Sequence, residues 1–373
     1  MIVETSRLEK IGIDRIVLNN FKVENFLQLE KKKIIKQSET IERFEYNDNN
    51  YSLTYSMIKN ESGEYNIATL EFNPGKMKAG HNLYNASIRD LKISLDEIVK
   101  EMMLKGVILD LEEAKIKELE INTTLNMSFL ELQDVIMLIG RANYQKALGL
   151  YSFNAESIPN KIRRDRNLYI NTKNTDFKKE NRGKVIKIYD KTFEMLLNQG
   201  IELDREVTRV EVLFGRDYYK YVVEKRQLDN SLKTFLSVDI IKDLFQDALK
   251  VEVKEKPLKE LEKIKKNLSY EFKNFKRNEK VKREMREKLN LHNKEIPEHL
   301  REERGIYKYL EQNSWIFDFK FLLEITKENT PSKHHTTYEK QIIKKYIDVK
   351  NYDVYVSFLK KIFEDFFLPT KTF

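Results

Sequence analysis

The segment Lys184–Glu194, KVIKIYDKTFE, places a tyrosine between two lysines. Because side chains alternate along a β-strand, Lys187, Tyr189 and Lys191 are expected on one face. A tyrosine hydroxyl has an ordinary pKa of about 10, and neighbouring ammonium groups favour its anion and hold a phosphate close. The pattern therefore suits a tyrosine nucleophile that attacks a phosphodiester. Taken alone, the pattern is more typical of an ordinary amphipathic strand with a surface tyrosine, since the chain has 19 tyrosines.

Acidic side chains recur on other segments that are expected to form strands. They are Asp14, Glu118, Glu120 and Glu211. Carboxylates that converge from several strands can bind a hard cation such as Mg²⁺ or Mn²⁺. Such a metal would polarise a phosphoryl oxygen and offset charge in the transition state. Taken alone, each of these acids is more often a solvated strand residue. Arg209 shares the face of Glu211, and together with Lys187 it is a candidate DNA contact.

Several familiar kinds of active site are missing from the sequence. There is no glycine-rich P-loop followed by Lys-Ser or Lys-Thr, and no Gly-x-Gly-x-x-Gly follows a predicted strand. The chain has no cysteine, which excludes disulfides, a thiol nucleophile and a cysteine-bound zinc. The five histidines form neither a zincin pair nor the His-apolar-His motif of many nicking enzymes. The adjacent pair His334 and His335 is expected at the surface.

Composition points to a protein with a polyanionic partner. The chain has 373 residues and a formal net charge of +8, with a pI near 9.1. No window approaches the roughly 18 to 20 apolar residues of a membrane span, and the first ten residues lack a secretory signal. We therefore expect a cytoplasmic protein with no membrane partner. Lys-rich proteomes also produce basic proteins of many functions, so charge alone leaves the partner open.

Much of the positive charge is concentrated in one window after residue 250. Residues 251–290 contain 14 Lys and Arg against 8 Asp and Glu, an excess of +6. Apolar residues recur every three or four positions from Leu258 to Phe275, which predicts a long helix over about Leu258–Leu289 with one apolar stripe. The helix is either a solvated element docked by that stripe or a basic surface for phosphates. Its candidate DNA contacts are Lys273, Lys276, Arg277, Lys280 and Arg283.

Periodicity predicts an α+β protein in which an antiparallel-sheet nicking domain, residues 1–250, precedes a mostly helical, basic C-terminal domain, residues 251–373. The expected strands are 11–21, 51–58, 65–72, 117–126, 167–173, 184–189 and 207–214. The other expected helices are 93–107, 128–147, 191–199 and 352–373. Ser94 and Asp96 are expected to cap the first of these helices, and Ser128 with Glu131 the second.

Taken in chain order, three segments resemble the rolling-circle replication initiators of filamentous phages, of the gene II protein type, and related plasmid initiators of Gram-positive bacteria. The matching segments are Asn73-Pro74-Gly75-Lys76 followed by Gly80-His81-Asn82, then Tyr189-Asp190-Lys191 with Glu194, and finally Thr208-Arg209-Val210-Glu211. The matches cover roughly residues 10 to 220. The C-terminal part resembles nothing that we can name.

The resemblance implies a specific activity. Such proteins nick one strand at an origin, become linked to the 5′ phosphate through tyrosine, and later rejoin the strands. It gives Tyr189 the role of nucleophile and Lys191 that of a contact to the scissile phosphate. It assigns Mg²⁺ or Mn²⁺ to Glu211, Glu120 and Asp14, although the family has an Arg where this chain has Glu118. His81 is either a further metal ligand or part of a polar turn.

The expected partners are a replication origin with a single-stranded or hairpin nick site, a host helicase and a second copy of the chain. One alternative remains a non-catalytic, sequence-specific DNA-binding regulator or origin-binding protein. Another is a structural scaffold whose basic charge only reflects genomic composition. A covalent protein–DNA adduct separates the first function from both alternatives.

Overall fold

The computed structural model describes residues 2–3, 10–61, 63–143, 147–148, 166–171, 183–238, 240–288 and 351–363. The chain divides into two compact units. The sheet unit comprises Met1–Leu130 and Asn143–Val251, and the helical unit comprises Glu131–Ala142 and Glu252–Phe373. The predicted α+β class, with a large antiparallel sheet and a helical part, is confirmed.

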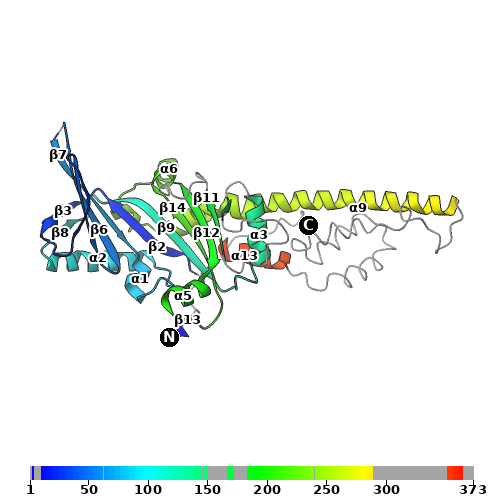
Figure 1. Ribbon diagram of the computed structural model, residues 1–373, viewed down its shortest axis with the longest axis horizontal. Helices are drawn as coiled ribbons and strands as arrows, with labels where there is room; N and C mark the ends of the chain where they lie inside the picture. The colour runs from blue at the N-terminus through cyan, green and yellow to red at the C-terminus, as the bar shows by residue number, and fades with distance from the viewer. Residues whose placement is uncertain are drawn as a thin grey trace. The chain divides into compact units, whose positions relative to one another are not determined.

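The described part of the sheet unit contains one ten-stranded sheet in which every neighbouring pair is antiparallel (Figure 1). In sheet order the strands are β10 (Ala147–Leu148), β11 (Asn167–Asn171), β12 (Lys184–Asp190), β14 (Thr208–Phe214), β9 (Lys115–Leu125), β2 (Gly12–Asn19), β7 (Gly63–Phe72), β6 (Tyr51–Asn60), β5 (Ile41–Asn47) and β4 (Lys33–Gln37). Two short ribbons pair β1 (Ile2–Val3) with β13 (Glu202–Leu203) and β3 (Lys22–Glu24) with β8 (Ile108–Asp110).

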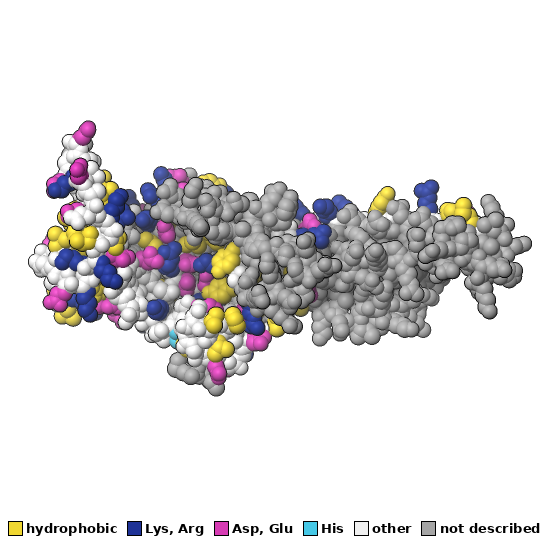
Figure 2. All heavy atoms as spheres, viewed as in Figure 1, with side chains coloured by type: hydrophobic (Ala, Val, Ile, Leu, Met, Phe, Trp, Pro, Cys, Tyr) yellow, Lys and Arg dark blue, Asp and Glu magenta, His cyan; other side chains and the backbone are white. Residues whose placement is uncertain are grey.

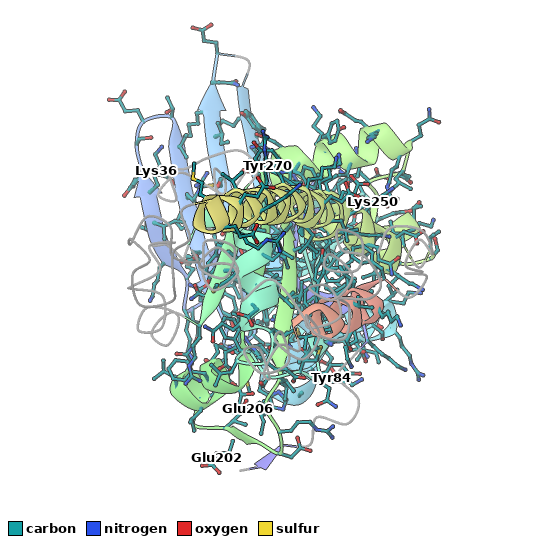
Figure 3. The ribbon with its side chains drawn as sticks, turned by 90° about the vertical axis from the view of Figure 1, so that its right-hand side faces the viewer. Lys36, Tyr84, Glu202, Glu206, Lys250 and Tyr270 are labelled. Carbon is teal, nitrogen blue, oxygen red and sulfur yellow. The ribbon has the colours of Figure 1, made fainter. Side chains whose placement is uncertain are left out.

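Burial explains why the central strands were visible in the sequence and the outer ones were not. All seven residues of β14 are buried, and the seven predicted strands are all found, within a few residues of their expected ends. The strands β4 and β5 were not predicted, nor were the short strands β1, β3, β8, β10 and β13. Ala147 of β10 was predicted to end a helix. Every residue of β4 is exposed, including Lys36 at the outer edge of the sheet (Figure 3). Lysines on such an edge discourage pairing with another strand, and they also hide the strand pattern.

The helices of the sheet unit pack around this sheet. They are η1 (Phe26–Gln28), α1 (Pro74–Ala79), α2 (Ile88–Leu104), α5 (Lys191–Gln199), α6 (Arg216–Arg226), α7 (Leu232–Phe235) and α8 (Ile241–Leu249). The prediction that α2 begins near Ser94 is wrong, because the helix begins at Ile88, five residues before the expected start, where Ser87 and Asp90 form a reciprocal capping box. Ser94 is instead buried within the helix.

The helix predicted over residues 128–147 is shorter than expected. α3 spans Gln133–Ala142, so it begins five residues after Ser128, the predicted capping residue. The chain before α3 is held by the sheet instead. Phe129 is buried, and the carbonyl of Met127 accepts a hydrogen bond from Thr208 Oγ1 at 2.9 Å.

The described part of the helical unit contains α3, α9 (Lys256–Lys288) and α13 (Asn351–Ile362). A π-helical segment, η2 (Lys250–Glu255), directly precedes α9 in the chain and includes the boundary between the two units. α9 confirms the predicted long helix. α3 contacts both α9 and α13, and Arg141 pairs with Glu260 at 3.0 Å. The predicted helix over 352–373 is found only as far as Ile362, and residues 364–373 lie outside the described residues. Within the described chain, no helix is both long and apolar enough to cross a membrane.

Candidate active site

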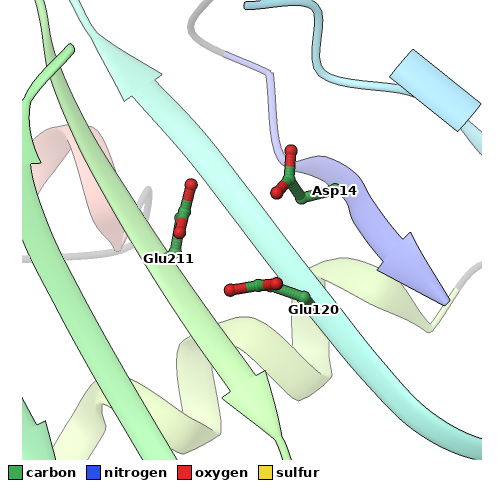
Figure 4. Close-up of side chains that lie close together, drawn as sticks. All are labelled: Asp14, Glu120 and Glu211. Carbon is green, nitrogen blue, oxygen red and sulfur yellow. The ribbon is translucent and has the colours of Figure 1, made fainter. Parts of the chain in front are cut away.

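Three carboxylates from adjacent strands converge at the centre of the sheet. Asp14 comes from β2, Glu120 from β9 and Glu211 from β14 (Figure 4), and we call these residues the acid cluster. One carboxylate oxygen of each lies within 4.8 Å of the others, and all three residues are buried. The sequence analysis named these three residues as candidate metal ligands, and the fold brings all three together.

Asp14 reaches the cluster because β2 is irregular. The register between β2 and β9 shifts between Ile13 and Arg15, so Asp14 is the extra residue of a β-bulge. A bulge re-aims the side chain that it carries. Arg15, the next residue, then lies beside the cluster and pairs with Glu71 at 2.9 Å and Glu118 at 3.1 Å. Glu118 is thus held by Arg15 and lies outside the acid cluster.

Tyr189 adjoins the acid cluster on β12. Its hydroxyl donates a hydrogen bond to Glu211 Oε1 at 2.5 Å. Burial, followed by the negative charge of Glu211, raises the pKa of Tyr189 well above 10. This is opposite to the expectation that two lysines would favour the tyrosine anion, because burial and the adjacent carboxylate of Glu211 disfavour that anion. Both ammonium groups are in addition already paired with carboxylates.

Lys187 is paired within the cluster itself. Its Nζ bonds Glu120 and also Glu211, the latter at 3.2 Å. Burial acts to lower the pKa of Lys187, but the two carboxylates outweigh it and raise the pKa above its ordinary value. Burial acts to raise the pKa of Glu211, but Lys187 and Arg209 lower it. As placed here, Lys187, a predicted DNA contact, balances the charge of the acid cluster.

Lys191 does not continue the strand. β12 ends at Asp190, which caps the N-terminus of α5 by accepting from Phe193 N at 2.9 Å, so Lys191 is the first helical residue. The side chain of Lys191 is fully buried, and its ammonium donates to Asn82 Oδ1 at 2.9 Å and to Glu194 Oε2 at 2.6 Å. The ammonium nitrogen lies 5.6 Å from the centre of the Tyr189 ring. Burial and then the charge of Arg209 lower the pKa of Lys191 to about 8.

Arg209, predicted as a DNA contact, is completely buried. Its guanidinium donates to the carbonyls of Asn82 and Leu83, the latter at 2.5 Å, and its Nε donates to Thr124 Oγ1 at 3.1 Å. In this arrangement it fastens the loop after α1 to the sheet and lies 3.5 Å from Asp14.

The loop after α1 carries His81, the fourth candidate metal ligand. Its Nδ1 accepts a hydrogen bond from Leu83 N at 3.3 Å, and His81 is outside the group of oxygens within 4.8 Å. Burial, with a smaller effect of Lys191, lowers the pKa of His81. The loop approaches β2 closely at Gly12, where a Cβ atom would come within 2.6 Å of the backbone of Asn85. This placement favours the polar-turn alternative for His81.

The predicted DNA contacts of the helical unit lie along α9. Arg277, Lys280 and Arg283 are exposed. Lys280 and Arg283 each lie 3.9 Å from a glutamate one turn further along the helix. The side chains of Lys273 and Lys276 are outside the described residues.

Sequence reasoning missed two polar residues at this site. Tyr169 on β11 lies opposite Lys187 on β12. Burial raises the pKa of Tyr169 above its ordinary value, although the charge of Lys187 acts in the opposite direction. Asn122 on β9 is fully buried, and its Nδ2 donates to Asp14 Oδ1 at 3.1 Å. The period-two pattern around Glu120 could have indicated Asn122, whereas Tyr169 depends on strand pairing.

The donor set of the acid cluster fits a divalent metal. Three carboxylates at this separation repel one another, and burial together with Glu211 raises the pKa of Asp14 to about 7. A fully buried oxygen, Asn122 Oδ1, has no hydrogen-bond partner among the described residues. Oxygen ligands alone, with no sulfur or imidazole, suit Mg²⁺, Mn²⁺ or Ca²⁺.

Similarity to known proteins is found among solved structures. No family model matches the chain, and no curated protein matches it. Among solved structures, the chain is similar to a rolling circle replication initiator protein from Geobacillus stearothermophilus. The identity is 10% and the TM-score 0.34, and the match covers 65% of this chain and 84% of that one.

Proposed function

We propose that the chain is a rolling-circle replication initiator that nicks one DNA strand at an origin through Tyr189 and later rejoins strands. The observation that carries the proposal is the hydrogen bond from the Tyr189 hydroxyl to Glu211, a member of the acid cluster. A tyrosine, a buried carboxylate cluster and a buried lysine are the groups that metal-assisted transesterification requires. The motif resemblance of the same residues supports the proposal independently.

In the proposed reaction the Tyr189 oxygen attacks the scissile phosphorus. A phosphotyrosyl bond forms to the 5′ phosphate, the bond from phosphorus to the 3′ oxygen breaks, and the hydroxyl proton ends on that 3′ oxygen. Glu211 orients the phenol through its Oε1 atom. Because one phosphodiester is exchanged for another, the freed 3′ hydroxyl can reverse the step and rejoin strands.

A divalent ion held by the acid cluster would polarise a phosphoryl oxygen and favour the tyrosine anion. Lys191 would place its ammonium near the tyrosine ring and the scissile phosphate. Arg209 would hold the loop after α1 against the sheet, which keeps Asn82 on the Lys191 ammonium. We assign this chemistry to the nicking domain, residues 1–250, and a contribution to DNA affinity to the basic C-terminal domain, residues 251–373.

The decisive experiment is covalent capture of labelled, single-stranded DNA from the cognate origin in the presence of Mn²⁺. The wild-type chain is expected to form an adduct that survives denaturation. The variant Tyr189→Phe loses only the hydroxyl, so it should bind the same DNA and form no adduct. Tyr221→Phe, at an exposed tyrosine on α6, is the matched control and should form the adduct normally. Adduct formation by Tyr189→Phe at the wild-type level would reject the proposal.

A further inference from the structure

Asn122 lies beside the acid cluster. It follows Glu120 by two positions on β9, so the two side chains share one face of the sheet. On the neighbouring strand β14, Glu211 is paired directly with Asn122. On its other side, its Nδ2 donates to Oδ1 of Asp14 at 3.1 Å. Asn122 is therefore placed next to Glu120 and Glu211 by its position in the sheet, and next to Asp14 by a hydrogen bond.

The two ends of the Asn122 amide differ in their contacts. The nitrogen donates a hydrogen bond to Asp14, whereas the oxygen is buried without a hydrogen-bond partner among the described residues. A flipped amide would turn its oxygen against the carboxylate of Asp14, so the observed orientation is the favourable one. An unpaired buried polar atom costs about 1–3 kcal/mol. This unpaired oxygen belongs to a residue that adjoins the acid cluster, where a bound cation would offset that cost.

Asn73 provides an internal comparison. Its Nδ2 also donates to Asp14 Oδ1, at 3.3 Å. Its Oδ1, however, accepts from Lys76 N at 2.7 Å and caps α1. Both ends of that amide are satisfied without a ligand, so of these two amides only that of Asn122 has an oxygen available.

We infer that Asn122 Oδ1 is a fourth protein ligand of the divalent cation at the acid cluster. The inference rests on the proposed function, because it assumes that the cluster binds a metal. A neutral amide oxygen adds a ligand without adding negative charge, which suits a hard cation already facing three carboxylates. It also explains why an asparagine occupies this position although leucine would fill the buried space without an unpaired oxygen.

The test measures Mn²⁺ binding by the full chain without DNA, from the electron paramagnetic resonance signal of free Mn²⁺. Asn122→Leu removes the oxygen and should weaken Mn²⁺ binding about 10-fold or more. Asn122→Asp keeps an oxygen and should bind Mn²⁺ at least as tightly as the wild type. Glu118→Gln is the matched control, since it changes another polar side chain on the same face of β9 that lies outside the acid cluster, and it should keep the wild-type affinity.

Thermal unfolding without metal separates the ligand role from a merely structural one. Asn122→Leu should melt no lower than the wild type, and Mn²⁺ should raise its melting temperature less. Equal Mn²⁺ affinity of the wild type and Asn122→Leu would overturn the inference. If Asn122→Leu does not fold, weaker binding by Asn122→Asp would overturn it instead. A wild-type chain that forms the DNA adduct but binds no Mn²⁺ would reject the metal site itself and leave Tyr189 as nucleophile.

Discussion

The centre of the sheet and the helix α9 use the same charged residue types in opposite ways. Around the acid cluster, Lys187, Lys191 and Arg209 are each bonded to named oxygen acceptors, and the last two are completely buried. Along α9, the basic side chains of Lys259, Lys263, Arg277, Lys280 and Arg283 are exposed, and the last two face glutamates only at 3.9 Å. Tyr270 on the same helix is also exposed (Figure 3).

The difference shows that position within the fold decides what a charge can do. A buried charge interacts strongly with a few groups because the local dielectric is low, whereas an exposed charge is screened by water and salt. On the face shown in Figure 2, Lys and Arg side chains of the sheet unit are interspersed with Asp and Glu. The net charge of the sheet unit is therefore a weaker indicator of its function than its few buried charged groups are.

The largest effect is expected from removing one charge of the acid cluster. Glu211→Gln keeps the shape but weakens metal binding and the contact to Tyr189, so nicking should fall at least about 100-fold. Glu120→Gln should behave alike. Glu118→Gln is the matched control, because Glu118 lies two residues away on β9 and pairs with Arg15 outside the cluster. Adduct formation over time measures all three, and full activity of Glu211→Gln in excess EDTA would contradict the metal hypothesis.

Stability should also separate the two regions. Arg209→Met leaves the carbonyls of Asn82 and Leu83 without their buried donor, so the free energy of unfolding should fall by about 3–5 kcal/mol. Lys280→Gln on α9 removes an exposed pair at 3.9 Å and should have no measurable effect. Urea unfolding of the two variants gives both values. Similar losses in both would contradict the comparison.

A pH dependence is expected from Lys191. Its pKa is lowered from 10.5 to about 8, chiefly by burial. Between these pH values the unfolded chain binds a proton that the native chain does not, so this group makes the native state more stable as pH rises. Wild-type protein should therefore gain stability relative to Lys191→Met between pH 8 and 10.5. Thermal unfolding across this range checks it, and a constant difference between the two proteins would contradict it.

The smallest effect is expected from α9. Replacing Lys273, Lys276, Arg277, Lys280 and Arg283 by Gln should weaken binding to all DNA sequences alike. The slope of log affinity against log salt should flatten by about 0.9 for each phosphate that the variant no longer neutralises. Nicking of a single-stranded site should survive, because the nucleophile lies in the sheet unit. An unchanged slope, measured by binding isotherms at several salt concentrations, would make α9 a scaffold.

Elements with strong local patterns could be predicted from the amino-acid sequence. The strand that carries Tyr189, the strand with Arg209 and Glu211, the stop of α5 at Gly200 and the length of α9 all follow from periodicity and turn chemistry. The three acids could also be identified, because each lies on a predicted strand. Local patterns suffice for these features since each depends on neighbours in the chain.

How these residues meet depended on long-range packing. The bulge at Asp14 and the pairing of Asn122 with Glu211 depend on strand register, which no single segment encodes. Arg209 looked available for DNA because strand alternation does not show that the loop after α1 covers it. The pKa of Tyr189 depended on the burial of its hydroxyl beside the carboxylate of Glu211. The burial of each charged side chain, and the groups that it contacts, are properties of the folded chain. They determine which of these residues form the candidate active site.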